Sequence, residues 1–192
     1  NMSSVKQAGV AAVTNQLAYD DEVGAQAMRV LYDHARSEDE RPLCLVTSFI
    51  HPHDPYAARQ KYWDLYDREN VTLAEHPKPP KDVPPIALHN GREICRSFKN
   101  SPGGIPTDDE ARAIRHGYLA NTTYMDTQLG KVVDKLDELG LAENTVIVAW
   151  SDHGFHLGEK QRWAKRSLWT RSTRVPLIIA PPGRETAASC DL

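Results

Sequence analysis

The spacing of apolar side chains predicts two amphipathic helices. From Asp20 to Arg36, apolar residues recur at helical spacing, with acidic side chains near the start and basic ones near the end. A second helix is predicted to start after Thr107, because Thr107 and Glu110 have the spacing of a capping box. Its apolar positions keep a helical period as far as Gly140, and glycine is typical of a helix end.

Three short apolar runs, at 43–50, 145–150 and 175–180, predict buried strands. A short helix rich in aromatic side chains is expected within 57–66. Between 67 and 106, many prolines predict a long irregular stretch, which in a compact domain usually covers a functional site or is mobile. The order of these elements predicts an α/β fold with a mainly parallel sheet flanked by helices.

Composition and charge then narrow the classes of partner. A chain of 192 residues with 40% hydrophobic and 26% charged residues can bury one substantial core. The formal net charge of -3 comes without a basic stripe, so nucleic acid is not an expected partner. No apolar run approaches the roughly 20 residues that cross a bilayer, so no membrane partner is expected either. The oligomeric state is left open.

Polar clusters directly follow two of the predicted strands, at 51–54 and 151–154. Ligands collect beyond the carboxyl ends of strands in open α/β sheets, so both clusters are expected to face one edge of the sheet. A carboxylate with imidazoles suits a divalent cation or an oxyanion, and Gly154 would let the backbone turn away sharply. Purely structural interpretations stay open: Asp152 could cap the next turn with His153 packed beside it, His53 could bond a backbone carbonyl, and Lys165 could be a solvated charge.

Eight segments together resemble the sulfatases of the alkaline-phosphatase superfamily in residue type and order: 118–120, 126–130, 136–141, 145–147, 151–154, 157–159, 163–165 and 174–176. The resemblance is greatest to the iduronate-2-sulfatase-like branch, and 51–56 is also similar to choline sulfatases. It implies a partial alkaline-phosphatase-like fold, with residues 1–192 forming the C-terminal part of a catalytic domain.

The resemblance also implies roles for individual residues. His53 and Lys165 match catalytic positions that bind the sulfate, and His156 is a further candidate on the substrate side. Asp152 matches a carboxylate ligand of a calcium ion, which prefers oxygen donors. His153 matches the neighbouring position, where it would either bind the metal or donate a hydrogen bond to the sulfate.

One part of the family pattern is missing from this sequence. The family's nucleophile is a formylglycine made from the cysteine of a Cys-x-Pro-Ser-Arg motif, and none of Cys44, Cys95 and Cys190 lies in such a motif. Asp20 and Asp21 are predicted to open a helix, so they are not assigned the family's paired aspartate ligands. We therefore expect the nucleophile region and a C-terminal region to lie outside this chain, and the chain alone to be inactive.

The resemblance predicts a complete enzyme that hydrolyses sulfate esters through a calcium-bound formylglycine. Its expected partner is a sulfated small molecule or saccharide, such as one carrying iduronate 2-sulfate. Two alternatives remain: a phosphodiesterase or phosphonate hydrolase of the same superfamily, and a non-catalytic binder of sulfated ligands. The expected compartment is the periplasm, the extracellular space or the lysosome.

Overall fold

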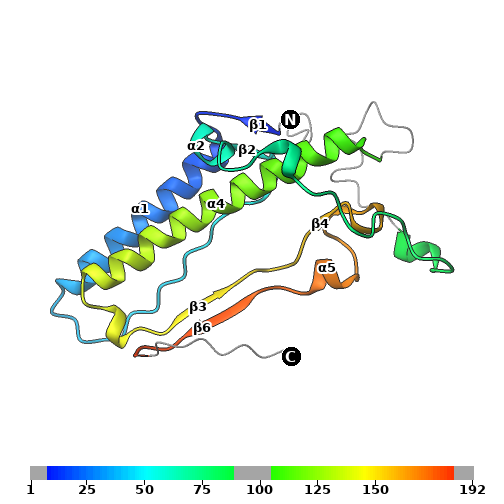
Figure 1. Cartoon of the computed structure of the whole chain (residues 1–192). Coiled ribbons are helices and arrows are strands. Elements are labelled where there is room, and N and C mark those ends of the chain that lie inside the picture. The colour runs from blue at the N-terminus through cyan, green and yellow to red at the C-terminus, as the bar shows by residue number, and fades with distance from the viewer. Residues whose placement is uncertain (1–7, 89–104, 184–192) are drawn as a thin grey trace.

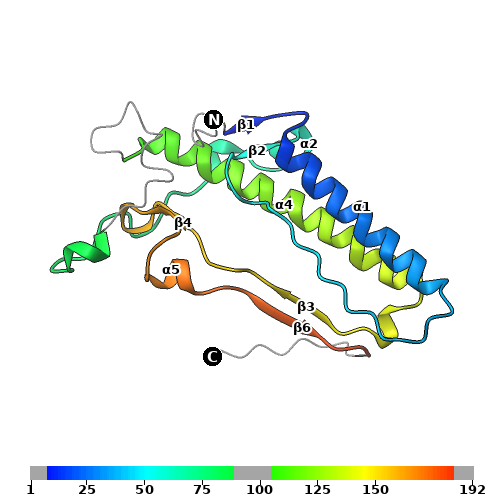
Figure 2. The same ribbon diagram turned by 180° about the vertical axis from the view of Figure 1, so that it is seen from behind.

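Two long helices lie side by side along one layer of the computed structural model, which describes residues 8–88 and 105–183 (Figures 1 and 2). They are α1 (Asn15–Ala35) and α4 (Asp108–Glu138). The two helices run in the same direction. Leu17 and Tyr124 share one apolar cluster, and Leu31 and Leu136, both further toward the carboxyl ends, share another. The second layer contains the strands β3 (Ile147–Trp150) and β6 (Leu177–Ala180).

Local caps set the starts of both long helices, and the predicted start was correct for α4. The capping box at the start of α4 is present, with Thr107 Oγ1 accepting from Glu110 N at 3.2 Å and Glu110 Oε2 accepting from Thr107 N at 2.8 Å. Gly140 follows the helix with a left-handed φ of 68°. The start of α1 was placed five residues too late, because Thr14 caps it by accepting from Leu17 N. Asp20 therefore lies inside the helix.

The α/β class is confirmed, with small sheets of both senses. β3 pairs with β6 in antiparallel register, Ile147 opposite Ala180, because the chain reverses between them. β1 (Gly9–Val10) pairs with β2 (Ala57–Ala58) in parallel, and β4 (His156–Leu157) pairs with β5 (Trp163–Ala164) in antiparallel register. Among the described residues the parallel pairing expected for most of the sheet is thus confined to β1 and β2.

The run at 43–50 differs from its prediction. It is extended but joins no strand ladder within residues 8–88 and 105–183. Its burial alternates, with Leu45, Thr47 and Phe49 half-buried while Val46 and Ile50 are exposed. Leu45 packs on the α1 and α4 core, so one face of this segment covers the helices and the other faces outward. An alternating, half-buried segment replaces the strand that we expected to be buried on both faces.

The remaining elements are short. The stretch predicted as one helix from 57 to 66 divides into β2 and α2 (Gln60–Trp63). The described residues also contain the 3₁₀ turns η2 (Arg68–Asn70), η3 (Pro85–Leu88), η5 (Ala142–Asn144) and η6 (Glu159–Gln161). The short helix α5 (Thr170–Thr173) precedes β6. Neither long helix has an apolar stretch able to cross a membrane, a finding limited to the described parts of the chain.

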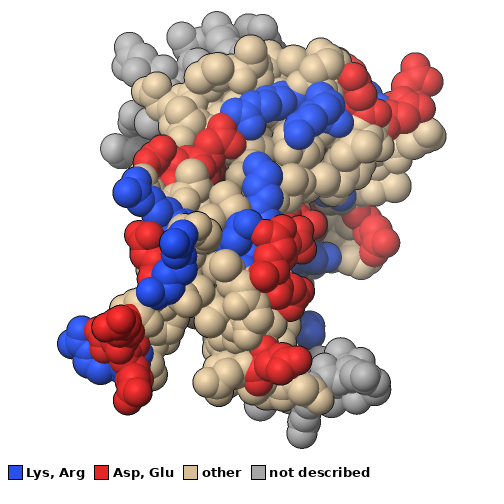
Figure 3. Space-filling view, turned by 90° about the vertical axis from the view of Figure 1, so that its left-hand side faces the viewer, with Lys and Arg blue, Asp and Glu red and all other residues tan. Residues whose placement is uncertain are grey.

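The outward face of β3 and β6 is apolar and open. Trp150 is 60% exposed and stands opposite Leu177, and Val148 stands opposite Ile179. Contiguous apolar faces of this kind usually mark a surface that another layer covers. On the face drawn in Figure 3, by contrast, Lys and Arg side chains are interleaved with Asp and Glu.

Candidate active site

The loop at 51–55 presents His53 in a partly exposed position. His53 N donates to Ile50 O at 3.1 Å, and both X–Pro peptide bonds in the loop are cis. His53 Nδ1 lies 2.8 Å from Asp54 O and 3.0 Å from Asp54 Oδ1, so the Nδ1–H donates to Asp54 and Nε2 is left for another partner. The bond to the Asp54 side chain raises the pKa of His53 above its ordinary value, although burial and Lys165 oppose this. His53 is therefore equipped to carry a proton.

Lys165 acts on His53 through its charge, although the two are far apart in sequence. That charge is the smallest of the influences on the pKa of His53, and it lowers the pKa. Lys165 is half-buried and directly follows β5. No hydrogen bond or ion pair of the described chain joins the two residues, and their joint catalytic role stays a prediction.

The backbone around Lys165 is held in an unusual conformation. Ala164 and Arg166, on either side, have left-handed φ angles of 64° and 61°, and Lys160 and Gln161 have 56° and 58°. Each left-handed residue other than glycine costs on the order of 1 kcal/mol, and such residues persist only where the surrounding structure enforces them. Clusters of this kind are typical of functional sites, so the conformation favours a functional Lys165 over a merely solvated one.

Glu159 organises the loop that carries Lys165. Its Oε2 accepts from Leu157 N at 2.8 Å, and its Oε1 lies 4.0 Å from both Arg115 Nη1 and Arg171 Nε. Arg115, from α4, also donates to Leu157 O at 2.9 Å. Arg115 and Asp54 carry no sequence signal of their own, because only their spatial neighbours identify them.

His156 lies beneath this loop rather than on its surface. It is fully buried, and its Nε2 is 3.4 Å from Ser167 Oγ. Burial lowers the pKa of His156 to about 4, so its ring is neutral near pH 7. Because the side chain is fully buried, contact of His156 with a substrate stays a prediction.

The buried His156 should make the protein sensitive to acid. Its pKa is lower in the folded than in the unfolded chain, so between pH 6.5 and about 4 the unfolded state binds more protons and stability falls as the pH falls. We expect this group to remove on the order of 2 kcal/mol from the free energy of unfolding between pH 7 and pH 4.5. Urea unfolding of the wild type and of His156→Gln at both pH values measures the effect; equal losses in the two proteins would contradict it.

Asp152 and His153 form a separate pair at the end of β3. The Asp152 side chain is 82% exposed, and its Oδ2 lies 3.4 Å from His153 Nε2. No backbone N–H of the described chain donates to Asp152, so the carboxylate does not act as the turn cap that we had considered. No hydrogen bond or ion pair in the described parts joins either residue to His53 or Lys165. The shared edge predicted for both clusters is not seen as a direct contact.

The donor set for a metal is incomplete in the described chain. No group of three or more His, Cys, Asp or Glu side chains gathers there in a way that could hold an ion. Asp152 offers a hard oxygen donor of the kind that calcium prefers, and His153 adds one nitrogen. The two residues fit one side of a calcium shell and leave the rest of the shell to other groups.

Gly154 has a role different from the one predicted. Its φ is not left-handed, so a sharp turn does not require glycine here. A Cβ at this position would lie 2.0 Å from Arg171 O and 2.7 Å from Arg174 O, and Gly154 N donates to Ser172 O at 2.8 Å. Glycine is required because the backbone after β3 passes directly against α5.

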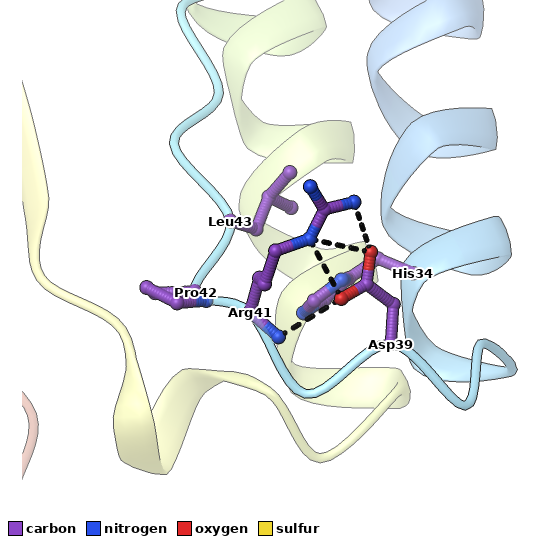
Figure 4. Close-up of a pocket in the computed structure, with 5 residues that line it drawn as sticks. All are labelled: His34, Asp39, Arg41, Pro42 and Leu43. Carbon is purple, nitrogen blue, oxygen red and sulfur yellow. Dashed lines mark hydrogen bonds and ion pairs between the residues drawn. The ribbon is translucent and has the colours of Figure 1, made fainter.

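Two surface hollows lie away from these residues. One is lined by Arg68, Glu69, Asp109 and Arg112. The other, near the end of α1, is drawn in Figure 4, where Arg41 Nε lies 2.9 Å from both carboxylate oxygens of Asp39. The Arg41 guanidinium already donates to the Asp39 carboxylate. Arg41 therefore has little remaining capacity to bind an anion in this hollow.

Comparison with known proteins decides the family. A family model described as sulfatase matches residues 4–189. The chain belongs to the sulfatase family. A choline-sulfatase of Rhizobium meliloti is 42% identical over 187 residues, which are 95% of this chain and 36% of the relative. An iduronate 2-sulfatase of Mus musculus is 39% identical over 171 residues, or 86% of this chain and 31% of the relative.

Solved structures agree with the fold of this sulfatase chain. A phosphonate monoester hydrolase from Silicibacter pomeroyi matches with a TM-score of 0.63 and 26% identity, over 83% of this chain and 33% of that one. A protein solved in complex with its substrate D-glucosamine-2-N,6-O-disulfate matches with a TM-score of 0.67 and 18% identity, over 85% of this chain and 43% of that one. The predicted alkaline-phosphatase-like fold is confirmed, and the sulfatase chain spans about a third of the curated relatives it matches.

Proposed function

We propose that this chain forms the His53 and Lys165 side of the active site of a sulfatase that hydrolyses sulfate esters. The observation that carries the proposal is the pair of left-handed residues that fix Lys165 from both sides, and the action of the lysine charge on His53 supports it. A protonated histidine and a lysine that face one site suit a negatively charged oxyanion such as a sulfate ester. A merely solvated lysine would not need the strained backbone around it.

The chemistry of ester hydrolysis uses these two groups differently. As the bond between sulfur and the ester oxygen breaks, negative charge moves onto the leaving oxygen, and a protonated His53 can donate to it from Nε2. Lys165 stabilises the remaining sulfate oxygens by its charge. A calcium ion held in part by Asp152, with His153 beside it, would polarise the sulfate. The formylglycine nucleophile would come from a part of the polypeptide that is not in this sequence.

Two features support a larger catalytic unit around this chain. The relatives it matches are about three times as long, and the outward face of β3 and β6 is apolar and open. We propose that the rest of a sulfatase domain covers that face. The proposed substrate is a sulfated carbohydrate such as one bearing iduronate 2-sulfate, and choline sulfate is the competing small molecule.

A second candidate function is the hydrolysis of phosphonate monoesters. The Silicibacter pomeroyi phosphonate hydrolase, at 26% identity, favours it. A comparison of substrates separates the two. This chain is joined to a formylglycine-bearing sulfatase segment, and its turnover of an aryl sulfate is compared with that of an aryl phosphonate. A higher kcat/KM for the sulfate supports the proposal, and a higher value for the phosphonate contradicts it.

Calcium should bind the chain alone only weakly. Asp152 and His153 supply at most two ligands, whereas calcium takes about 6 to 8 oxygen ligands. We expect isothermal titration of the 192-residue chain to show no binding tighter than roughly the millimolar range of weak extracellular sites. An Asp152→Asn variant is the control. A submicromolar affinity that this substitution abolishes would show that the site is already complete.

A further inference from the structure

A buried carboxylate on α1 holds the loop that carries His53. Asp20 is fully buried. Its Oδ1 accepts from Ile50 N at 2.8 Å, and its Oδ2 accepts from His51 N at 3.0 Å and lies 2.6 Å from His51 Nδ1. All three donors belong to two consecutive residues at the start of the loop. A buried carboxylate is stable only with such a set of donors. These hydrogen bonds therefore fix the position of Asp20 and of the Ile50–His51 backbone together.

His51 is as tightly held as the carboxylate that it faces. Its side chain has no exposed surface, and its ring packs edge-on against the Tyr124 ring with centroids 4.9 Å apart. Within residues 8–88 and 105–183, Asp20 is the sole hydrogen-bond partner of the ring, because Nε2 has none. The orientation of His51 is thus set from α1.

Hydrogen bonds lead from Asp20 to His53. Asp20 fixes the N–H of Ile50, and the carbonyl of Ile50 accepts from His53 N at 3.1 Å. The Nδ1 of His53 is hydrogen-bonded to Asp54, so Nε2 is the ring atom left to bind a ligand. The position of Nε2 therefore depends on how the beginning of the loop is anchored.

We propose that Asp20 is a positioning residue, which acts through Ile50 and His51 to place His53 for the sulfate. A role of Asp20 in catalysis rests on the proposed sulfatase function. The anchoring of the loop by Asp20 can be measured without any turnover, so the anchoring and the sulfatase function can be disproved separately. If Asp20 served stability alone, its loss would weaken the fold without moving His53.

The next residue in the helix provides a matched control. Asp21 also makes several bonds, accepting from Tyr124 Oη at 2.9 Å and Gln128 Nε2 at 3.1 Å and pairing with Arg59. It touches no residue of the 50–54 loop through these bonds. Asp21→Asn removes the same charge from the same helix as Asp20→Asn, and it should leave the loop anchored.

The test is NMR of the isotope-labelled 192-residue chain, recording the His53 ring through a pH titration and the amides of 51–54, with melting temperatures alongside. In Asp20→Asn the side-chain NH₂ meets backbone donors, so the loop should loosen, its amides should shift, and the pKa of His53 should fall toward the ordinary value of about 6.5. In Asp21→Asn the pKa of His53 should stay raised. If both variants lower the melting temperature but leave His53 as in the wild type, Asp20 is structural and the proposal is wrong.

A gentler variant covers the case in which Asp20→Asn does not fold. His51→Phe removes one of the three bonds to Asp20 and keeps both backbone bonds and an aromatic ring against Tyr124. We expect the same direction of change in the His53 pKa, by a smaller amount. An unchanged His53 in a folded His51→Phe protein, together with unchanged loop amides, would likewise overturn the proposal.

Discussion

Replacing Lys165 by alanine should lower the turnover of a sulfate ester by on the order of 10²-fold or more and leave the melting temperature nearly unchanged. The experiment uses the chain joined to a formylglycine-bearing segment. Lys165 is half-buried and its charge acts on His53, and no described carboxylate pairs with it, so its removal breaks no ion pair in the described parts of the fold. Its charge is instead available to the sulfate, where charge develops as the ester bond breaks.

Lys160 is the control for that substitution. It lies in the same loop with a left-handed φ of 56°, and its Nζ stands 5.0 Å from the centre of the Trp169 ring. Lys160→Ala should leave turnover within a few-fold of the wild type. Equal activity in the wild type and Lys165→Ala would mean that the cluster from 160 to 166 is only a solvated surface. A sharp fall in melting temperature together with activity would mean that Lys165 is structural.

Gly154→Ala should destabilise the protein by about 3 kcal/mol or more. The new Cβ would stand 2.0 Å from Arg171 O and 2.7 Å from Arg174 O, and these are backbone atoms that cannot swing aside. Relief requires the backbone after β3 to move away from α5, which would break the bond from Gly154 N to Ser172 O. Chemical denaturation measures the loss.

Gly130→Ala is the matched substitution. Gly130 lies within α4, and a Cβ there meets nothing within 4 Å. Because glycine costs a helix interior roughly 0.5–1 kcal/mol relative to alanine, this variant should be neutral or slightly more stable. If Gly154→Ala is as stable as Gly130→Ala, the close packing of the loop against α5 does not exist in solution.

The elements that the sequence predicted correctly are those decided by neighbouring residues. The start of α4 is determined by Thr107 and Glu110, which form a capping box within a single turn, and by the helical spacing of the apolar residues after them. Strand pairing depends on segments far apart. Residues 43–50 have the composition of a buried strand, yet the chain offers them no strand partner in its described parts. The antiparallel register of β3 with β6 follows from how the intervening loop folds back, which apolar spacing does not reveal.

The candidate site divides in the same way. His53, Lys165 and Asp152 were identified through a resemblance. The charge of Lys165 acts on His53, whereas no described hydrogen bond or ion pair joins Asp152 to either residue. Asp20 was set aside because its helix was expected to begin there. Only the fold shows that its carboxylate reaches the residues before His53, 30 positions along the chain. A lone aspartate in an amphipathic helix carries no sequence signal for such a contact.

Whether His53 and Lys165 hold the same anion is tested most directly by titrating sodium sulfate into the labelled chain at constant ionic strength. We expect the His53 ring and the Lys165 side chain to follow one saturation curve with a common Kd. The His34 ring, near the end of α1, should stay unchanged. Lys165→Ala should abolish the response of His53. Separate curves for the two residues, or a response confined to Arg68 and Arg112 in the other surface hollow, would contradict a shared sulfate site.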